Sequence, residues 1–157
     1  MNAIVCYYSW HGHTAAAGKA IAEAVKGREV AILEVKRRRG ILGWLNGGRQ
    51  AAMGAASRIQ PLDIDWGAYD TVFIGSPTWA SAPAPAVNAL VQQANLAGKR
   101  VYLFGTCDGD TAQPMFDKLA PKVTAVGATV AGQFGVCGKI GMDGIAQAAR
   151  AWAGKLS

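Results

Sequence analysis

The chain has 157 residues, of which 51% are hydrophobic and 17% are charged, so its composition is globular and not disordered, and we expect a single domain over residues 1–157. No apolar run reaches the roughly 20 residues that a membrane span needs, and the sequence enters a strand-like run without a leader pattern, so we expect a cytoplasmic protein. The net charge is +6, but basic and aromatic residues do not interleave along the chain, so we do not expect nucleic-acid binding.

Strand-like and helix-like segments alternate along the sequence. Mainly apolar, strand-like runs predict five strands, at Asn2–Tyr8, Val30–Val35, Asp70–Gly75, Arg100–Gly105 and Thr129–Phe134. The segments between them predict helices, at Thr14–Val25, at Ala86–Gln93 after Pro83 and Pro85, from Pro114 through Leu119, and from a cap at Asp143 through Trp152. Strands that are apolar on both faces and separated by helices indicate a parallel sheet covered on both sides.

This pattern predicts an α/β fold, a three-layer doubly wound five-stranded parallel sheet with strand order 2-1-3-4-5. In such a sheet, ligands bind beyond the carboxyl ends of the strands, where the strand order reverses. The segments that follow the first, third and fourth strands are therefore the candidate binding loops.

The segment Lys36–Asp65 does not fit the alternation. The part between Val35 and Leu62 holds six Lys and Arg and no Asp or Glu, and it carries the whole excess of positive charge, because the other ten Lys and Arg balance all ten Asp and Glu. An amphipathic helix around Ile41–Leu45 is plausible there, although the nearby glycines weaken it. We call Lys36–Arg58 the basic segment; its six cationic residues are Lys36, Arg37, Arg38, Arg39, Arg49 and Arg58.

A polar turn, Ser9-Trp10-His11-Gly12-His13-Thr14, follows the first strand and leads into a helix. Such a turn points backbone N–H groups and the positive end of the helix dipole at one place, which suits an anion. The two hydroxyl groups add donors, and the glycine lets the backbone close around phosphate oxygens. The turn matches neither the Walker pattern nor G-x-G-x-x-G.

The turn resembles the phosphate loop of the flavodoxins, [S/T]-x-[S/T]-G-x-T, at Ser9, Gly12 and Thr14. His11 stands where the family usually has a third hydroxyl, and His13 where Asn or Lys is common. The resemblance implies a flavodoxin-like fold with FMN as cofactor, its phosphate held by this loop, including Trp10.

The third strand is followed by Gly75-Ser76-Pro77-Thr78-Trp79-Ala80, which is similar to the family's flavin-contacting stretch. The resemblance implies that Trp79 stacks on the flavin ring while Pro77 and Thr78 contact the ring edge and ribityl chain, next to Ala80. The alternative is that Trp79 only fills the core beneath a helix.

The fourth strand is followed by Thr106-Cys107-Asp108-Gly109. In the family the matching loop supplies backbone N–H groups to the pyrimidine edge of the flavin, so these four residues complete the expected site. Asp-Gly is also ordinary turn chemistry. In many flavodoxins this loop carries a second aromatic residue that covers the other face of the flavin. This sequence has no aromatic residue there before Phe116, so one face of the flavin is a candidate for exposure to a substrate.

The resemblance favours an electron carrier that exchanges electrons between a reductase and an acceptor protein. The alternatives are an FMN-dependent NAD(P)H:quinone-type oxidoreductase, and a flavodoxin-like interaction protein that has lost FMN. We expect the basic segment to meet acidic redox partners and do not expect membrane contact. Because typical flavodoxins are acidic and this chain is basic, we also expect a higher potential for the second reduction of the flavin.

The three cysteines, Cys6, Cys107 and Cys137, match no zinc pattern, and Cys6 sits in an apolar run as a small buried hydrophobe. Cys107 and Cys137 follow neighbouring strands, so a redox-active thiol pair is a further hypothesis. His11 and His13 are two residues apart without a third ligand, so we expect no metal site.

Overall fold

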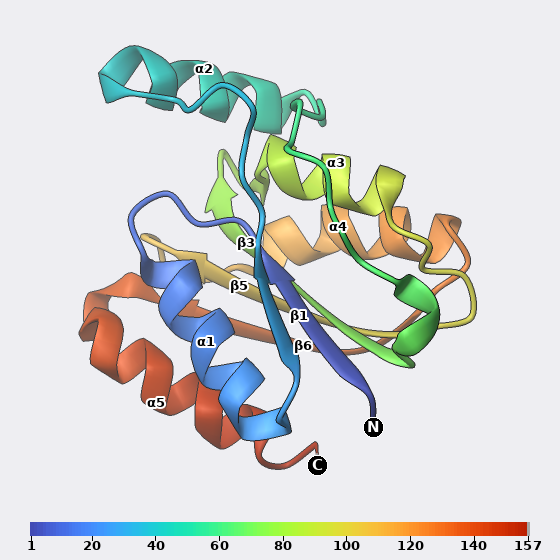
Figure 1. Ribbon diagram of the computed structural model, residues 1–157. Coiled ribbons are helices and arrows are strands. Elements are labelled where there is room, and N and C mark those ends of the chain that lie inside the picture. Colours follow the sequence, from blue (N-terminus) through green and yellow to red (C-terminus); the bar gives the residue numbers. More distant parts are fainter. Residues whose placement is uncertain (157) are drawn as a thin grey trace.

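The computed structural model describes residues 1–156 of the chain. Strands and helices alternate from the N-terminus, as the apolar pattern predicts (Figure 1). The strands are β1 Ala3–Tyr7, β2 Arg28–Ala31, β3 Thr71–Trp79, β4 Ala82–Pro83, β5 Arg100–Cys107 and β6 Thr129–Cys137. The helices are α1 His13–Val25, α2 Gly40–Ala52, α3 Pro85–Gln93, α4 Gln113–Ala125 and α5 Gly141–Ala153, with 3₁₀ turns at Trp66–Ala68 and Gly138–Ile140.

Five strands form a parallel sheet in the order β2-β1-β3-β5-β6. This is the predicted order 2-1-3-4-5, because the additional strand, β4, is only two residues long and pairs antiparallel with the end of β3. The α/β doubly wound fold is confirmed. The order reverses between β1 and β3, so the expected binding edge lies at the carboxyl ends of these two strands and of β5.

The sheet has a hydrophobic core on each face, which explains why its central strands carry apolar residues on both faces. On one face α1 and α5 cover Val5, Tyr7 and Phe73. On the other, α3 and α4 cover Cys6, Ile74 and neighbouring residues. Cys6 is fully buried, as predicted. Figure 1 shows the two pairs of helices on opposite sides of the sheet and α2 apart from both, above one end of the strands.

The prediction for the second strand was wrong in position, because β2 spans Arg28–Ala31 instead of Val30–Val35. The C-cap Lys26 has a left-handed backbone (φ 52°), so the strand begins directly after α1. Its pairing with β1 ends at Tyr7↔Ala31, where β1 itself ends. The apolar run continues beyond that point without a parallel partner, and Glu34 instead bridges antiparallel to Ile59.

The other boundaries differ in smaller ways. Strands β3, β5 and β6 each continue two to four residues beyond the predicted end, because the pairing persists to Pro77↔Thr106 and Cys107↔Cys137. Pro83 lies in β4 and does not enter a helix. Asp143 lies in the first turn of α5 and is not its cap, which is Ile140; the carboxylate still favours the positive helix end there.

Candidate functional site

A cavity of about 430 Å³ lies at the carboxyl ends of β1, β3 and β5, roofed on one side by α2. This volume lies within the range of small-molecule sites. The residues that line the cavity come from the three predicted loops and from α2; they are Ser9, Trp10, His11, His13, Thr14, Trp44, Leu45, Gly48, Arg49, Pro77, Thr78, Trp79, Ala80, Thr106, Cys107 and Asp108.

The first wall is the turn between β1 and α1. The Ser9 hydroxyl accepts hydrogen bonds from the backbone N–H groups of Gly12 and Ala15, both at 3.2 Å. Gly12 is the N-cap and has a left-handed backbone (φ 96°), which glycine adopts at little cost. The N–H group of Ala15, the third residue of α1, donates to Ser9. The first two residues of the helix, His13 and Thr14, line the cavity, so the positive end of the α1 dipole lies at the cavity wall.

Three threonines line the cavity, and their hydroxyls differ in hydrogen bonding. Those of Thr14 and Thr106 are 2.7 Å apart and bond to each other, which joins the start of α1 to the end of β5. Thr78 Oγ1 is buried and has no hydrogen-bond partner among the described residues. A buried hydroxyl without a partner is costly, so a ligand in the cavity that bonds to it would remove that cost.

The second wall is the hairpin that ends β3. Its two-residue turn is Ala80-Ser81, and both residues have a left-handed backbone (φ 47° and 58°), which non-glycine residues seldom adopt. The hairpin places the half-buried ring of Trp79 edge-on to Tyr8 and Trp10, with centroids 5.6 and 5.3 Å away. Trp79 packs against the core and also lines the cavity, so it has features of both sequence-based interpretations.

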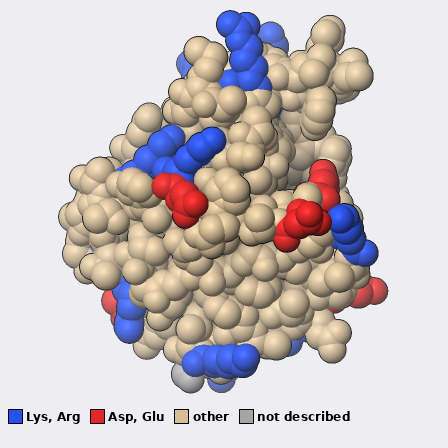
Figure 2. All heavy atoms as spheres, turned by 180° about the vertical axis from the view of Figure 1, so that it is seen from behind, with Lys and Arg blue, Asp and Glu red and all other residues tan. Residues whose placement is uncertain are grey.

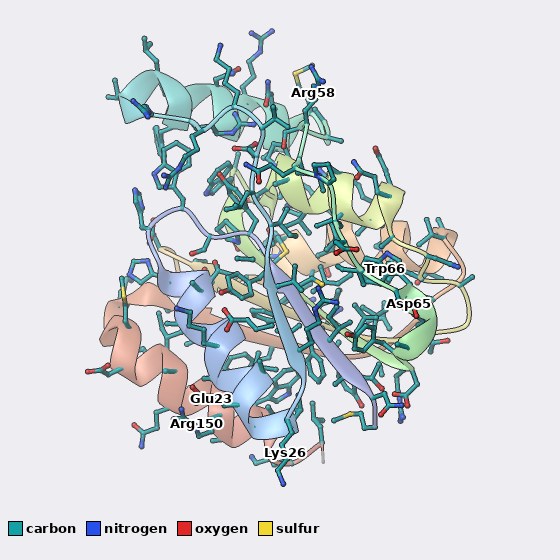
Figure 3. All side chains as sticks on the ribbon, viewed as in Figure 1. Glu23, Lys26, Arg58, Asp65, Trp66 and Arg150 are labelled. Atoms are coloured by element: carbon teal, nitrogen blue, oxygen red, sulfur yellow. The ribbon has the colours of Figure 1, made fainter. Side chains whose placement is uncertain are left out.

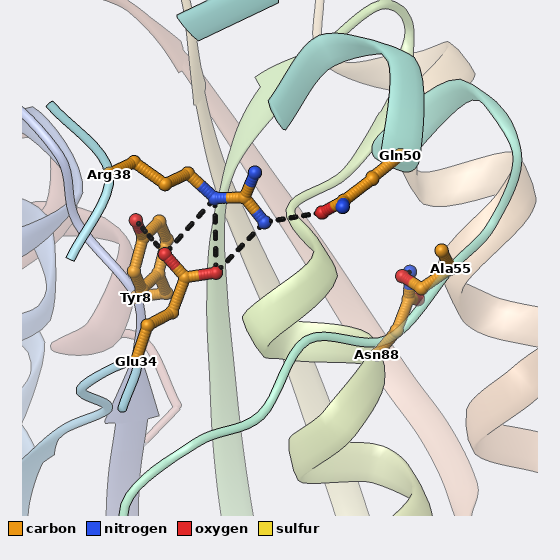
Figure 4. A network of polar contacts seen from close by, with 6 residues as sticks. All are labelled: Tyr8, Glu34, Arg38, Gln50, Ala55 and Asn88. Atoms are coloured by element: carbon orange, nitrogen blue, oxygen red, sulfur yellow. Dashed lines mark hydrogen bonds and ion pairs between the residues drawn. The ribbon is translucent and has the colours of Figure 1, made fainter. Parts of the chain in front are cut away.

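The third wall, α2, is held by a buried ion pair (Figure 4). The carboxylate of Glu34 accepts hydrogen bonds from Tyr8 Oη at 3.0 Å and from Arg38 Nε at 3.1 Å. Arg38 Nη2 then donates to Gln50 of α2 at 2.6 Å, and the guanidinium lies 5.8 Å from the Trp79 ring. Burial, followed by the charge of Glu34, raises the pKa of Tyr8, so this hydroxyl remains a donor to a higher pH than an ordinary tyrosine does.

Charges are unevenly distributed about the cavity. Arg49 and Asp108 are the charged residues that line it. On the face opposite to that of Figure 1, basic side chains lie at the top, the end at which α2 lies, and also at mid-height and along the bottom, whereas no acidic side chain is seen at the top (Figure 2). Arg58 is at this end as well, far from the exposed ion pair of Glu23 and Arg150 that joins α1 to α5 (Figure 3).

The sequence-predicted site residues are thus largely brought together. All of them line the cavity except Gly12, whose N–H bonds to Ser9, and Gly109, whose carbonyl accepts from two cysteines. Sequence reasoning missed the residues of α2: Trp44, Leu45, Gly48 and Arg49. The available signal is a tryptophan next to the most basic stretch of the chain, but the sequence connects the basic segment only with partner contact.

Two other site types find no support in the described part of the chain. Among residues 1–156, no three His, Cys, Asp or Glu side chains are grouped so that they could hold a metal ion. In the same residues, none of the helices combines the length and the apolar character that crossing a membrane requires.

The comparisons with known proteins agree with this architecture. No curated protein matches the sequence. A protein from Bacteroides eggerthii, provisionally described as a flavoprotein, is 25% identical with a TM-score of 0.75, over 96% of this chain and 94% of that one. A flavoprotein from Lactobacillus acidophilus in complex with FMN is 22% identical with a TM-score of 0.75, over 85% and 92%.

A more distant structural relative is a Megasphaera elsdenii flavodoxin. It is 19% identical with a TM-score of 0.57, over 95% of this chain and 98% of that one. Likeness at such identities shows the fold. The family itself is shown by the flavodoxin family model, which matches residues 2–134. The chain therefore belongs to the flavodoxin family.

Proposed function

We propose that the chain binds FMN in the cavity between α2 and the strand ends and acts as an electron carrier. The observation that supports this best is the partnerless buried hydroxyl of Thr78 in the wall of a cavity of suitable size. FMN would supply the electron-transfer chemistry, while the protein would set its position and potential. That a similar flavoprotein binds FMN supports the same assignment.

The residues at hand fit each part of FMN. The N-terminus of α1, with the N–H groups of His13 and Thr14, suits the phosphate. The Thr78 hydroxyl suits a ribityl hydroxyl or a ring-edge polar atom. The indoles of Trp10 and Trp79 offer flat apolar surface for the ring system.

The first test is the visible spectrum of the purified protein, followed by titration of the flavin-free form with FMN and with riboflavin. We expect flavin bands and much tighter binding of FMN than of riboflavin, because only FMN carries the phosphate. A colourless protein that ignores FMN would leave the fold intact and refute the function.

A variant pair tests the assignment of the cavity. Thr78→Val removes the partnerless hydroxyl, and we expect FMN to bind about fivefold more weakly, the equivalent of about 1 kcal/mol for one hydrogen bond. The matched control is Ser57→Ala, because Ser57 carries the other partnerless buried hydroxyl of the described residues and does not line the cavity. Equal affinities in the two variants would place FMN elsewhere.

One observation favours a second candidate, an FMN-dependent NAD(P)H:quinone-type oxidoreductase. Trp44 lines the cavity although 57% of its surface is exposed, so this wall is reachable by a planar substrate from solvent. Steady NAD(P)H oxidation with a quinone acceptor would identify the enzyme. A protein that is reduced only through a separate reductase would be the carrier.

The outer surface of α2 suits an acidic redox partner. Ile41 and Leu42 are more than half exposed, and the exposed Lys36, Arg37 and Arg39 precede them directly in the chain. An apolar patch with a cationic rim is a common form of protein-binding surface. Acidic groups on the partner would steer it to this end of the molecule, where the cavity opens.

Salt dependence tests this docking. We expect the electron-transfer rate with an acidic partner to fall steeply as ionic strength rises. Arg37→Gln with Arg39→Gln should slow the rate at low salt, whereas the charge-matched pair Lys19→Gln with Lys155→Gln should not. A rate that is indifferent to salt and to both pairs would contradict docking at α2.

The charge distribution also predicts the potential. Among the residues that the structure describes, Asp108 is the only acidic one that lines the cavity, and Arg49 lines it from α2. The second reduction of FMN, which places negative charge on the ring, is therefore opposed less than in acidic flavodoxins. We expect a potential for this step above theirs, measured by potentiometric titration; a value as low as theirs would contradict the reasoning.

A further inference from the structure

Two cysteines lie side by side at the carboxyl edge of the sheet. Cys107 ends β5, Cys137 ends β6, and the strand register pairs the two residues directly. Paired residues of neighbouring strands are about 4.8 Å apart. This separation lies inside the range of about 4.4–6.8 Å between Cα atoms that a disulfide accepts. Both residues are free thiols in the structure.

Both thiols point to the same place. The Sγ atoms of Cys107 and Cys137 lie 3.6 and 3.0 Å from the carbonyl oxygen of Gly109, each placed to donate to it. The two side chains also line a second cavity, of about 210 Å³, between the ends of β5 and β6. The sulfur atoms therefore share one side of the sheet and a route from solvent.

We propose that Cys107 and Cys137 form a reversible disulfide that controls the loop at Gly109. Cys137 is the more exposed of the two and is the attacking cysteine. Cys107 is buried, and burial, followed by the neighbouring Cys137, raises the pKa of its thiol, so it acts second. Cys6 lies inside the core and takes no part.

The oxidant in this reaction is a low-molecular-weight disulfide. The Cys137 thiolate attacks one of its sulfur atoms, forms a mixed disulfide and releases one small thiol. The Cys107 sulfur then loses its proton, attacks Cys137 Sγ and releases the second small thiol. Two protein thiols are thereby oxidised to one protein disulfide, and one small disulfide is reduced to two small thiols.

Disulfide formation would change the loop, because it removes both S–H donors from the Gly109 carbonyl. That residue follows Asp108, which lines the first cavity, so the loop would reorganise at the cavity wall. This second part of the proposal rests on the proposed FMN site. We expect the oxidised protein to bind FMN about tenfold more weakly than the reduced protein, because the Gly109 carbonyl would lose its two S–H donors.

The experiment starts with flavin-free, fully reduced protein, which is incubated with excess glutathione disulfide. Thiols are then counted after denaturation, and the mass is measured intact and after tryptic digestion. We expect the count to fall from the three cysteines of the chain to one. We also expect the intact mass to fall by about 2 Da, and the tryptic peptides Val101–Lys118 and Val123–Lys139 to be joined until a reductant is added.

Two variants complete the test. Cys107→Ser should stop at the mixed disulfide on Cys137, and Cys137→Ser should react far more slowly with the small disulfide. Three unreacted thiols, or a stable mixed disulfide in the wild-type protein, would overturn the proposal. Because thiols are counted without flavin, a failure to bind FMN leaves this result interpretable, and a disulfide that leaves FMN affinity unchanged would overturn only the coupling to the site.

Discussion

The buried ion pair of Glu34 and Arg38 should be the main support of α2. Their side chains are only 4% and 9% exposed, and Arg38 also bonds to Gln50 of the helix. Arg38→Met would leave a buried carboxylate with the Tyr8 hydroxyl as its remaining side-chain donor. Removing one partner of a buried ion pair costs about 3–5 kcal/mol. Because the Tyr8 hydroxyl still donates to Glu34, we expect the free energy of unfolding to fall by about 3 kcal/mol, the lower end of this range.

Urea denaturation at neutral pH measures this loss. The control is Arg39→Met, which removes an equal charge from an exposed neighbour and should change the unfolding free energy by less than about 0.5 kcal/mol. The double variant Glu34→Gln with Arg38→Met should recover much of the loss, because it has no unpaired buried charge. A loss below about 1 kcal/mol for Arg38→Met would refute a supporting role for the pair.

Three further predictions concern the rest of the fold. Burial raises the pKa of Cys6 from 9.0 to about 12, so the unfolded chain loses this proton first, and stability falls as pH rises above about 9. Between pH 8 and pH 10 the wild type should lose about 1.4 kcal/mol more than Cys6→Ala in urea denaturation. Gly18→Ala would place a Cβ in steric conflict with the Tyr7 ring. It should lower the melting temperature, with a cost of about 1–3 kcal/mol. Glu23→Gln, which breaks an exposed ion pair, should cost less than about 1 kcal/mol in the same assay.

The order of elements was predictable because strands that are apolar on both faces alternate with helices, a combination that indicates a parallel sheet covered on both sides. The ends of strands were not. Val30–Val35 is apolar except for Glu34, yet only its first two residues belong to β2, since β1 ends opposite Ala31. A strand ends where its neighbour ends, and the sequence of one strand does not contain that information.

The parts of the site that follow directly from strand ends were predictable from the sequence. The part that α2 contributes was not, because its position depends on contacts between residues of different segments. The loops after β1, β3 and β5 follow from the rule on strand ends. The position of α2 above them depends on Arg38, which donates hydrogen bonds both to Glu34 and to Gln50 of α2. The hydrophobic periodicity of the sequence contains no signal for these contacts. The three glycines Gly43, Gly47 and Gly48 even argued against a helix there.

One of these glycines has a packing reason that the structure reveals and a variant pair can test. A Cβ at Gly47 would lie 2.9 Å from Trp79 Cζ3, whereas a Cβ at Gly48 would meet nothing within 4 Å. Alanine in a helix interior is favoured over glycine by up to about 1 kcal/mol, so Gly48→Ala should stabilise the protein by nearly that amount. Gly47→Ala gains the same propensity but must displace α2 from the Trp79 ring, and we expect a net loss in urea denaturation together with weaker FMN binding. Equal stabilisation by both substitutions would mean that α2 does not rest on Trp79, and the cavity would then lack the wall that sequence reasoning missed.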